Sequence, residues 1–272
     1  MIQHISSRHN PRVKEALRLR DARCRRQAGR FVIDGAREVL RAIAGDVEIL
    51  EAFLCEPLLG GDEARRAADE LAAHAGVAQT VTVEIFDKLS YGNRADGVLA
   101  VARTPTRSLA QLSLPPAPLV AVIEGIEKPG NVGAVLRSAD GAGLDAVVVA
   151  DPRTDLFNPN AIRASLGTVF RANVCTATTE ETVAWLKRLD VPALAARPDA
   201  ERLYTAADFR QGAAIVLGSE AQGLSARWSG PGVAGIRLPM HGVADSLNVS
   251  AAAAVLFYEA QRQRSQSPRG AR

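Results

Sequence analysis

In the N-terminal part of the chain, short apolar runs alternate with segments whose apolar residues recur at helical spacing. Val13, Ala16 and Leu17 follow that spacing between residues 10 and 19, and Pro11 suits a first helical turn. The same patterns predict helices at 36–44 and 63–75 and strands at 31–33, 49–54, 80–83 and 98–102. Such alternation predicts a small α/β unit.

A second series of strands and helices begins at Leu119, after a proline-rich stretch. Residues 105–118 contain four prolines and no sustained periodicity, which is typical of a linker. Beyond them, strands are predicted at 119–123, 146–150, 191–196, 213–217 and 234–238. This pattern predicts a doubly wound parallel sheet, in which ligands bind at the carboxyl ends of the strands. We therefore expect domains at 1–104 and 119–264, joined by a linker at 105–118 and followed by a basic tail at 265–272.

Composition is that of an ordinary globular protein and argues against several classes. With 272 residues and 47% hydrophobic content, the chain can build one large or two modest cores. No apolar run approaches the roughly 20 residues of a membrane span, and the N-terminus lacks a secretory pattern, so we expect a cytoplasmic protein with no membrane partner. The three cysteines and four histidines are dispersed, which argues against a disulfide framework and against a metal site.

Positive charge is concentrated at both ends of the chain. Residues 1–30 hold eight arginines and one lysine against two acidic residues, and four arginines but no acid follow Glu259. Such clusters are typical of a nucleic-acid partner, because each phosphate contact releases counterions. For the tail, a merely solvated terminus is an equal alternative. The candidate nucleic-acid contacts are Arg8, Arg12, Arg23, Arg25, Arg26 and Arg163, and for Arg163 a structural salt bridge is an equal alternative.

Three loops that follow predicted strands carry the candidate chemistry. The first spans residues 129–140 and places Arg137 six residues after Asn131, on a helix opened by glycines. Glycines also lie four residues before and after Arg137, so we expect a bare groove beside the guanidinium that admits an anionic substrate. The alternative is a surface ion pair between Arg137 and Asp140.

The second loop, residues 217–225, presents a single carboxylate between two glycines. Glu220 follows a buried strand, and Gly218 and Gly223 allow backbone to approach a ligand closely. The alternative is that Glu220 is an exposed turn residue or a helix cap.

The third loop, residues 238–250, leads into a helix predicted from 247 to about 262. Ser246 occupies the expected N-cap position, and Asn248 lies in the first turn. Capping explains Ser246 but leaves Asn248 unexplained. The helix is apolar nearly all round, which predicts burial under the sheet or against a second subunit. His241 in this loop is interpreted as a neutral loop residue, with a substrate or cofactor contact as the alternative.

Taken together, the three loops resemble the three sequence motifs of the SpoU (TrmH) family of RNA ribose 2′-O-methyltransferases, in the SPOUT superfamily. The residues fall on the motifs in the family's order: Asn131 and Arg137, then Gly218, Glu220 and Gly223, then Leu238–Met240 with Ser246–Ser250. Residues 119–262 carry this resemblance. Residues 5–102 more loosely resemble the substrate-binding domain of many members, which has a ribosomal-protein-like α/β fold.

The resemblance implies a trefoil-knotted parallel-sheet methyltransferase domain that binds S-adenosylmethionine, needs no metal and forms a homodimer with the active site at the interface. It implies catalytic roles for Asn131, Arg137, Glu220, Ser246 and Asn248. It also implies cofactor contacts from Leu217, Gly218, Ile236, Leu238, Met240 and Leu247. Arg137 either removes the proton of the ribose hydroxyl or binds a phosphate or the developing alkoxide.

The domain layout is similar to that of the ribosomal RNA members, including those that confer antibiotic resistance, so we expect large-subunit ribosomal RNA as the substrate, with transfer RNA as the alternative. A dinucleotide-dependent oxidoreductase is a further alternative, because Asp151 follows Gly133 by eighteen residues, as a ribose-binding acid would. Against it, the chain lacks the glycine fingerprint, and Glu124 and Glu127 would repel a pyrophosphate. The last alternative is a non-catalytic RNA-binding protein.

Overall fold

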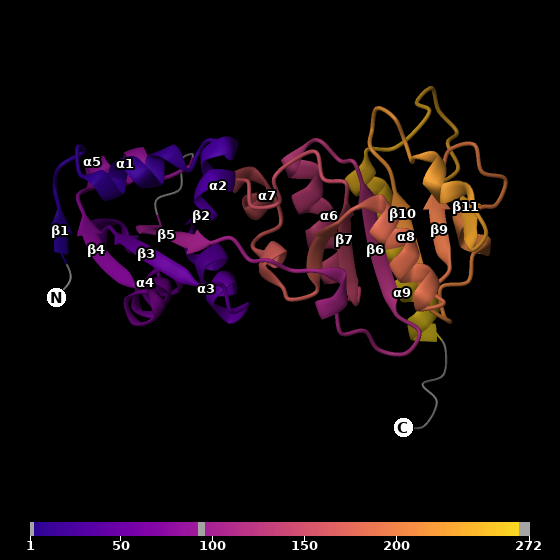
Figure 1. Cartoon of the computed structure of the whole chain (residues 1–272), viewed down its shortest axis with the longest axis horizontal. Coiled ribbons are helices and arrows are strands. Elements are labelled where there is room, and N and C mark those ends of the chain that lie inside the picture. Colours follow the sequence, from indigo (N-terminus) through magenta and orange to yellow (C-terminus); the bar gives the residue numbers. More distant parts are fainter. Residues whose placement is uncertain (1–2, 92–95, 267–272) are drawn as a thin grey trace. The chain divides into compact units, whose positions relative to one another are not determined.

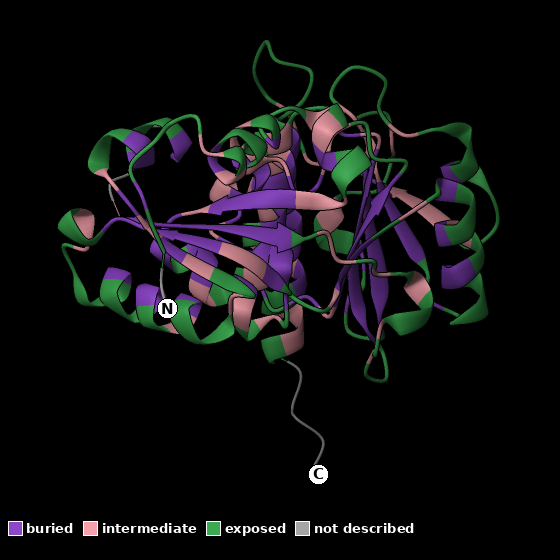
Figure 2. Ribbon diagram, turned by 60° about the vertical axis from the view of Figure 1, so that its left-hand side comes forward, coloured by how far each residue is buried: buried purple, intermediate pink, exposed green. Residues whose placement is uncertain are grey.

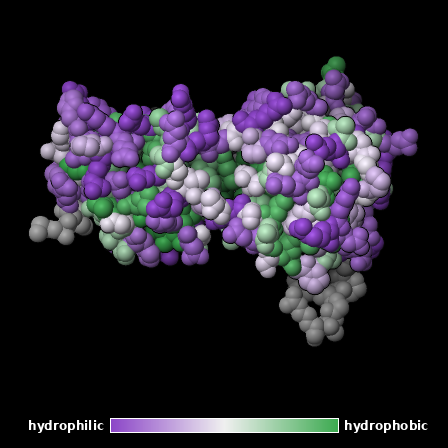
Figure 3. Space-filling model, viewed as in Figure 1, coloured by the Kyte–Doolittle hydropathy of each residue, from purple (hydrophilic) through white to green (hydrophobic). Residues whose placement is uncertain are grey.

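The computed structural model describes residues 3–91 and 96–266, which divide into two compact units. Unit 1 comprises Met1–Thr106 and Asp155–Arg171, and unit 2 comprises Arg107–Thr154 and Ala172–Arg272. The elements of both units are labelled in Figure 1. Buried residues concentrate in the strands of both sheets (Figure 2), and hydrophilic side chains cover much of the face of each unit seen in Figure 3.

Unit 1 contains a five-stranded mixed sheet in the order β1-β4-β3-β5-β2. Strand β4 pairs in parallel with β1 and β3, whereas β5 pairs in antiparallel fashion with β2 and β3. The strands are β1 (Gln3–Ile5), β2 (Arg30–Asp34), β3 (Ile49–Leu54), β4 (Val77–Val81) and β5 (Val98–Arg103). The helices are α1 (Pro11–Arg18), α2 (Ala22–Ala28), α3 (Ala36–Ala44), α4 (Asp62–His74) and α5 (Val83–Leu89).

One face of this sheet is covered by α1 and α5. Val13 and Ala16 of α1 and Phe86 of α5 belong to a buried cluster that includes Phe53 and Leu99 of the sheet. Helices α3 and α4 pack against each other and also contact β3 and β5. The expected α/β unit is therefore a sheet with helices packed against its strands.

The segment Asp155–Arg171 contributes α7 (Pro159–Ala164) and a short 3-10 turn (Thr168–Phe170) to unit 1. The ring of Phe31 on β2 stacks on Phe157 at 4.7 Å and on Phe170 at 5.9 Å between centroids. Chain continuity predicts this segment to belong to the second domain, residues 119–264. Its grouping with unit 1 depends on long-range aromatic packing, which no local pattern reveals.

Unit 2 is built on a six-stranded parallel sheet in the order β11-β9-β10-β6-β7-β8, which confirms the predicted parallel α/β architecture. The strands are β6 (Leu119–Glu124), β7 (Ala146–Ala150), β8 (Val174–Ala177), β9 (Ala193–Ala196), β10 (Ala213–Leu217) and β11 (Val233–Ile236). The helices are α6 (Pro129–Gly141), α8 (Thr179–Arg188) and α9 (Val249–Gln266).

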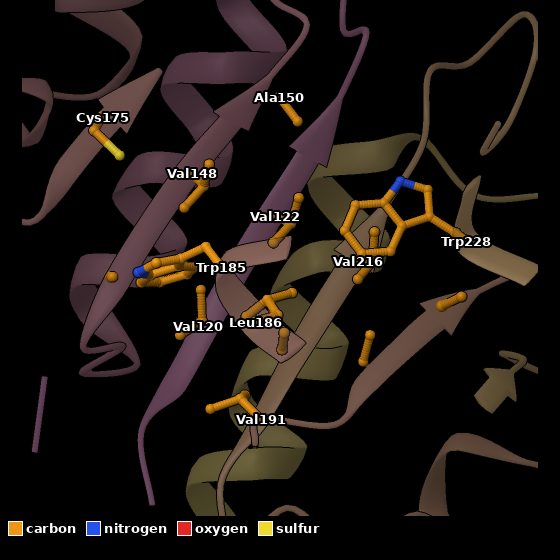
Figure 4. Close-up of a cluster of buried hydrophobic side chains, with 14 residues drawn as sticks. Val120, Val122, Val148, Ala150, Cys175, Trp185, Leu186, Val191, Val216 and Trp228 are labelled. Atoms are coloured by element: carbon orange, nitrogen blue, oxygen red, sulfur yellow. The ribbon is translucent and has the colours of Figure 1, made fainter. Parts of the chain in front are cut away.

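Helices pack on both faces of the parallel sheet. Trp185 and Leu186 of α8 pack on Val122 and Val216 in a buried cluster that also contains Trp228 (Figure 4). Helix α9 lies behind the strands in that view, where it contacts α6 and β10. Because β7 and β10 are buried along their whole length, each is a continuous apolar run, which is why the strands at 146–150 and 213–217 are predicted correctly.

Several local predictions are wrong or incomplete. The strands predicted at 191–196 and 234–238 span Ala193–Ala196 and Val233–Ile236. The predicted strand at 80–83 ends at Val81, because the chain turns at Thr82 and Val83 begins α5. The last helix begins at Val249 rather than at 247. Strand β8 escapes prediction because it is only 4 residues long and half of its positions are polar or small.

Candidate active site

The carboxyl ends of β6 and β10 form the topological switch point of the parallel sheet. The two strands are neighbours, with Val120 opposite Ala214 and Ile123 opposite Leu217. The chain leaves β6 toward β7 on one side and leaves β10 toward β11 on the other. Ligands of open parallel sheets bind in the crevice that such divergent connections leave.

A cavity of about 390 Å³ opens at this edge of the sheet, beside the carboxyl ends of β9, β10 and β11 and the start of α9. It is lined by all six residues that the sequence analysis proposed for the cofactor: Leu217, Gly218, Ile236, Leu238, Met240 and Leu247. Of the proposed catalytic residues, Glu220, Ser246 and Asn248 also line it, whereas Asn131 and Arg137 do not. The geometry thus brings the second and third loops around one cavity.

Polar side chains from all three loops meet next to this cavity. The amide nitrogen of Asn131 on α6 donates a hydrogen bond to Oε1 of Glu220 in the second loop. The amide nitrogen of Asn248 in the third loop lies 3.4 Å from Oδ1 of Asn131 and donates to it. Asn131 is therefore hydrogen-bonded to two residues that lie 89 and 117 positions further along the sequence.

Asn248 also caps α9, a role that the sequence analysis gave to Ser246. The Oδ1 atom of Asn248 accepts from the backbone nitrogen of Ser250 at 3.0 Å and from its Oγ at 2.6 Å. Because the helix begins at Val249, its cap is Asn248, and the N-cap assignment of Ser246 is wrong. Ser246 remains as an exposed residue of the cavity wall.

The second loop closes on itself through its glycines. The backbone nitrogen of Gly223 donates to the carbonyl of Ser219 at 2.9 Å, and that of Ser219 donates back at 3.2 Å. A Cβ at Gly218 would overlap the backbone of Gly223, which itself has a φ of +64°. Glycine is therefore required at position 218 because the loop's own backbone passes close to it. The closed loop holds Glu220 at the cavity.

Arg137 lies outside the cavity, on the exposed surface of α6. It forms none of the hydrogen bonds or ion pairs found among residues 3–91 and 96–266, so the pair with Asp140 is not formed. Of the two glycines beside it, Gly133 is buried, and a Cβ at Gly141 would lie 3.0 Å from the hydroxyl of Tyr258. The glycine at 141 thus serves the packing of α6 against α9.

Glu124, at the end of β6, is a buried carboxylate that the sequence analysis treated only as a turn residue. It is 7% exposed and accepts from Oγ1 of Thr179 at 2.7 Å and from both the backbone nitrogen and Oγ of Ser225 at 2.8 Å. It therefore ties the second loop and the start of α8 to the strand that precedes the first loop. In the sequence, the one sign of this role is that Glu124 directly follows the apolar run Leu119–Ile123.

The arginines proposed to contact RNA in unit 1 differ in how far their side chains are exposed to solvent. Arg8, Arg23 and Arg26 are exposed, and Arg12 is half-buried with its Nη1 atom 3.0 Å from Oε2 of Glu51. Arg25 is only 3% exposed; its Nε donates to Asp155 at 2.6 Å and its Nη1 donates to two backbone carbonyls. Its guanidinium is buried and hydrogen-bonded inside unit 1, so it has little surface to offer a phosphate.

Arg163 is engaged as well. It donates to the backbone carbonyl of Tyr91 and lies 3.9 Å from the carboxylate of Asp34. These contacts favour the structural alternative for Arg163.

The remaining observations concern the cysteine thiols, possible metal ligands and helix hydropathy. Burial raises the pKa of the Cys175 thiol to about 11, which keeps it protonated at neutral pH. Among the residues that the structure describes, no three His, Cys, Asp or Glu side chains gather as metal ligands, and no helix is long and apolar enough to cross a membrane.

Two family models match the chain. The SpoU rRNA methylase family matches residues 118–258, and the MRM3-like substrate-binding domain matches residues 10–100. A relative, the 23S rRNA (guanosine(2553)-2′-O)-methyltransferase RlmP of Bacillus subtilis, is 28% identical over 258 residues, which cover 94% of this chain and 98% of that protein.

Solved structures agree with this relationship. The crystal structure of an RNA 2′-O ribose methyltransferase is 42% identical, with a TM-score of 0.83 over 97% of this chain and 100% of that chain. The SpoU methyltransferase AviRb of Streptomyces viridochromogenes, solved with the cofactor AdoMet, is 25% identical, with a TM-score of 0.83 over 95% of this chain and 99% of that one.

Proposed function

The chain belongs to the SpoU rRNA methylase family, and from that premise we propose that it methylates a ribose 2′-hydroxyl of large-subunit ribosomal RNA. S-adenosylmethionine is the methyl donor. The observation that carries the proposal is the cavity at the ends of β9, β10 and β11, which meets the hydrogen-bonded side chains of Asn131, Glu220 and Asn248.

The cavity suits S-adenosylmethionine in size and in lining. A volume of about 390 Å³ lies in the range of pockets that enclose a cofactor of this size. Leu217, Ile236, Leu238 and Leu256 give it apolar walls, and the loops between them offer backbone polar groups. Leu217, Gly218, Ile236, Leu238, Met240 and Leu247 would hold the cofactor. When bound, it supplies a methyl group on a sulfonium whose leaving thioether is neutral, so the reaction requires alignment and proton removal.

The chain's polar residues would orient the ribose. Glu220 is held by Asn131, and Asn131 by Asn248, so hydrogen bonds rather than an ion pair among the described residues fix the carboxylate at the cavity. In this arrangement Glu220 accepts a hydrogen bond from a ribose hydroxyl. Arg137 binds the adjacent phosphate or the developing alkoxide, since a guanidinium hardly ever loses its proton in proteins.

The position of Arg137 supports a homodimer with a shared active site. Arg137 lies one turn from Gly141 on α6, and Gly141 contacts Tyr258 of α9. Val255 and Tyr258 expose 39% and 52% of their surface. This apolar surface, next to an arginine that has no partner among residues 3–91 and 96–266, suits a second copy of the chain, whose cavity Arg137 would complete.

The substrate is tested by mapping 2′-O-methyl groups on total RNA from cells with and without the gene. The proposal predicts the loss of one methylated site in the large-subunit RNA. A change confined to transfer RNA would refute the ribosomal substrate but not the chemistry.

A further inference from the structure

Arg197 is a residue of the cavity wall to which none of the three motifs assigns a role. It directly follows β9, and its backbone nitrogen donates to the carbonyl of Ile236 at 2.9 Å. It lines the cavity together with its neighbours Ala196 and Pro198. Its backbone is thus fixed at the carboxyl edge of the sheet, where ligands of this fold bind.

One nitrogen of the Arg197 guanidinium is hydrogen-bonded to the protein, whereas the others have no partner among the described residues. Its Nη2 atom donates to the carbonyl of Trp228 at 3.0 Å and to Oγ of Ser229 at 2.8 Å. Its Nε atom is buried and has no hydrogen-bond partner among the described residues. The Nη1 atom also forms none of the hydrogen bonds found among the described residues, so the guanidinium keeps a donor for an acceptor on a ligand in the cavity that Arg197 lines.

The charges around the cavity indicate which ligand group that acceptor belongs to. Arg197 is the one cationic residue among those lining the cavity, and Glu220 and Asp245 are the acidic ones. The amino-acid end of S-adenosylmethionine carries one carboxylate and one ammonium group, and its sulfonium is also positive. Glu220 and Asp245 complement the ammonium and sulfonium groups of the cofactor. The Arg197 guanidinium is then left to complement the cofactor's carboxylate.

We propose that Arg197 binds the carboxylate of the methionine part of S-adenosylmethionine, an inference that rests on the proposed function. The anchor on Trp228 and Ser229 holds the guanidinium in place before the cofactor arrives, so little side-chain freedom is lost on binding. Arg197 is then a specificity residue that distinguishes an amino-acid-bearing cofactor from nucleosides of similar size.

The test compares two ligands that differ only in the carboxylate: S-adenosylhomocysteine and its decarboxylated analogue. Calorimetric titration of Arg197→Met and Arg197→Gln should show about 10- to 100-fold weaker binding of S-adenosylhomocysteine than the unsubstituted protein, the range for one lost charge-assisted hydrogen bond. Binding of the decarboxylated analogue should stay unchanged. Arg227→Met is the matched control, because Arg227 lies in the same turn as Trp228, pairs with Glu180 at 3.5 Å and does not line the cavity.

Each other outcome has a separate meaning. Equal losses for both ligands would overturn the proposal and make Arg197 a support for the turn at Ala226–Ser229. Unchanged binding of both ligands would also overturn it, by showing that no contact exists. If the unsubstituted protein binds neither ligand, the proposed function itself fails. Should Arg197→Met not fold, as judged by its circular dichroism, Arg197→Gln gives the same comparison.

Discussion

Single side chains at this site act through partners that lie far away in the sequence. Glu220 is an exposed acid in a glycine-rich loop, and alone it resembles any turn residue. Glu220 accepts a hydrogen bond from Asn131, and Asn131 accepts one from Asn248, so the three residues form one hydrogen-bonded group. Arg137 is outside this hydrogen-bonded group and has no partner among the described residues. Its replacement is therefore the most direct test of the proposed chemistry.

Replacing Arg137 should separate binding from catalysis. We expect Arg137→Ala to bind S-adenosylmethionine nearly as well as the unsubstituted protein, because Arg137 does not line the cavity. Methyl transfer should fall by about 100-fold or more, the usual scale for loss of a group that assists proton transfer or charge stabilisation. Calorimetry and a tritium-transfer assay measure the two effects. Arg210→Ala, at an exposed surface pair with Asp208, is the control, and unchanged turnover in Arg137→Ala would remove Arg137 from the site.

Arg25 should matter for stability. Its guanidinium is 3% exposed and donates to Asp155 and to the carbonyls of Leu19 and Arg20. Arg25→Ala leaves the Asp155 carboxylate without its ionic partner, so we expect a loss of about 3–5 kcal/mol in the free energy of unfolding of unit 1, measured by urea denaturation. Arg23→Ala, at an exposed position, should change it by less than about 0.5 kcal/mol. Equal effects of the two substitutions would contradict this account.

At the scale of elements, the loops at the carboxyl ends of β6, β10 and β11 are shaped by backbone contacts as much as by side chains. The second loop closes between Ser219 and Gly223, and Gly218 leaves no room for a Cβ. Glu124 then holds this loop to the end of β6 through Ser225. The position of Glu220 is a property of the whole loop.

A methyl group at Gly218 should therefore disturb the cavity. We expect Gly218→Ala to fold but to bind S-adenosylhomocysteine about 10-fold or more weakly, because the added Cβ forces the loop open. The control is Gly230→Ala, since Gly230 has a negative φ and no atom within 4 Å of an added Cβ. Calorimetry measures both variants, and wild-type affinity in Gly218→Ala would show that the loop's closure does not shape the cavity.

The sequence predicts elements well where burial makes a strand uniformly apolar, and poorly where contacts are long-range. The helix at 36–44 and the strands at 49–54, 146–150 and 213–217 have the predicted bounds. The motif residues could be predicted because three loops matched a family in order. Neither the cap at Asn248 nor the burial of Arg25 could be predicted, because each depends on where the chain folds back.

At the scale of the whole molecule, the proposal joins an RNA-binding unit to a methyltransferase unit that works as a homodimer. Unit 1 displays exposed arginines at positions 8, 23 and 26, and unit 2 holds the cavity. The trefoil knot and the dimer that the family resemblance implies stay predictions. The exposed apolar surface of α9 next to Arg137 is what supports the dimer.

The dimer can be tested at Val255. We expect Val255→Glu to yield monomers in analytical ultracentrifugation and to lose methyl transfer, because it places a charge in the proposed apolar interface. Leu189→Glu is the matched control, since Leu189 follows α8 and is 42% exposed, against 39% for Val255. A monomeric unsubstituted protein, or a dimeric Val255→Glu variant, would refute this interface.

Mixing two inactive variants tests whether the active site is shared between copies. If Arg137 completes the partner's cavity, a mixture of Arg137→Ala and Glu220→Ala should regain methyl transfer. The mixed dimer then contains one site with both residues intact. No recovery, with dimers shown to exchange, would mean that Arg137 and Glu220 of the same copy work together.

The central claim is methyl transfer to a ribose hydroxyl, and the most direct measurement is transfer of tritiated methyl from S-adenosylmethionine by the purified protein. The substrate is ribosomal RNA from cells that lack the gene. After alkaline hydrolysis, the account predicts label in one alkali-resistant dinucleotide from the large-subunit RNA, because a 2′-O-methyl group blocks cleavage of the adjacent phosphodiester. Label released with mononucleotides, or no transfer to any RNA, would contradict it.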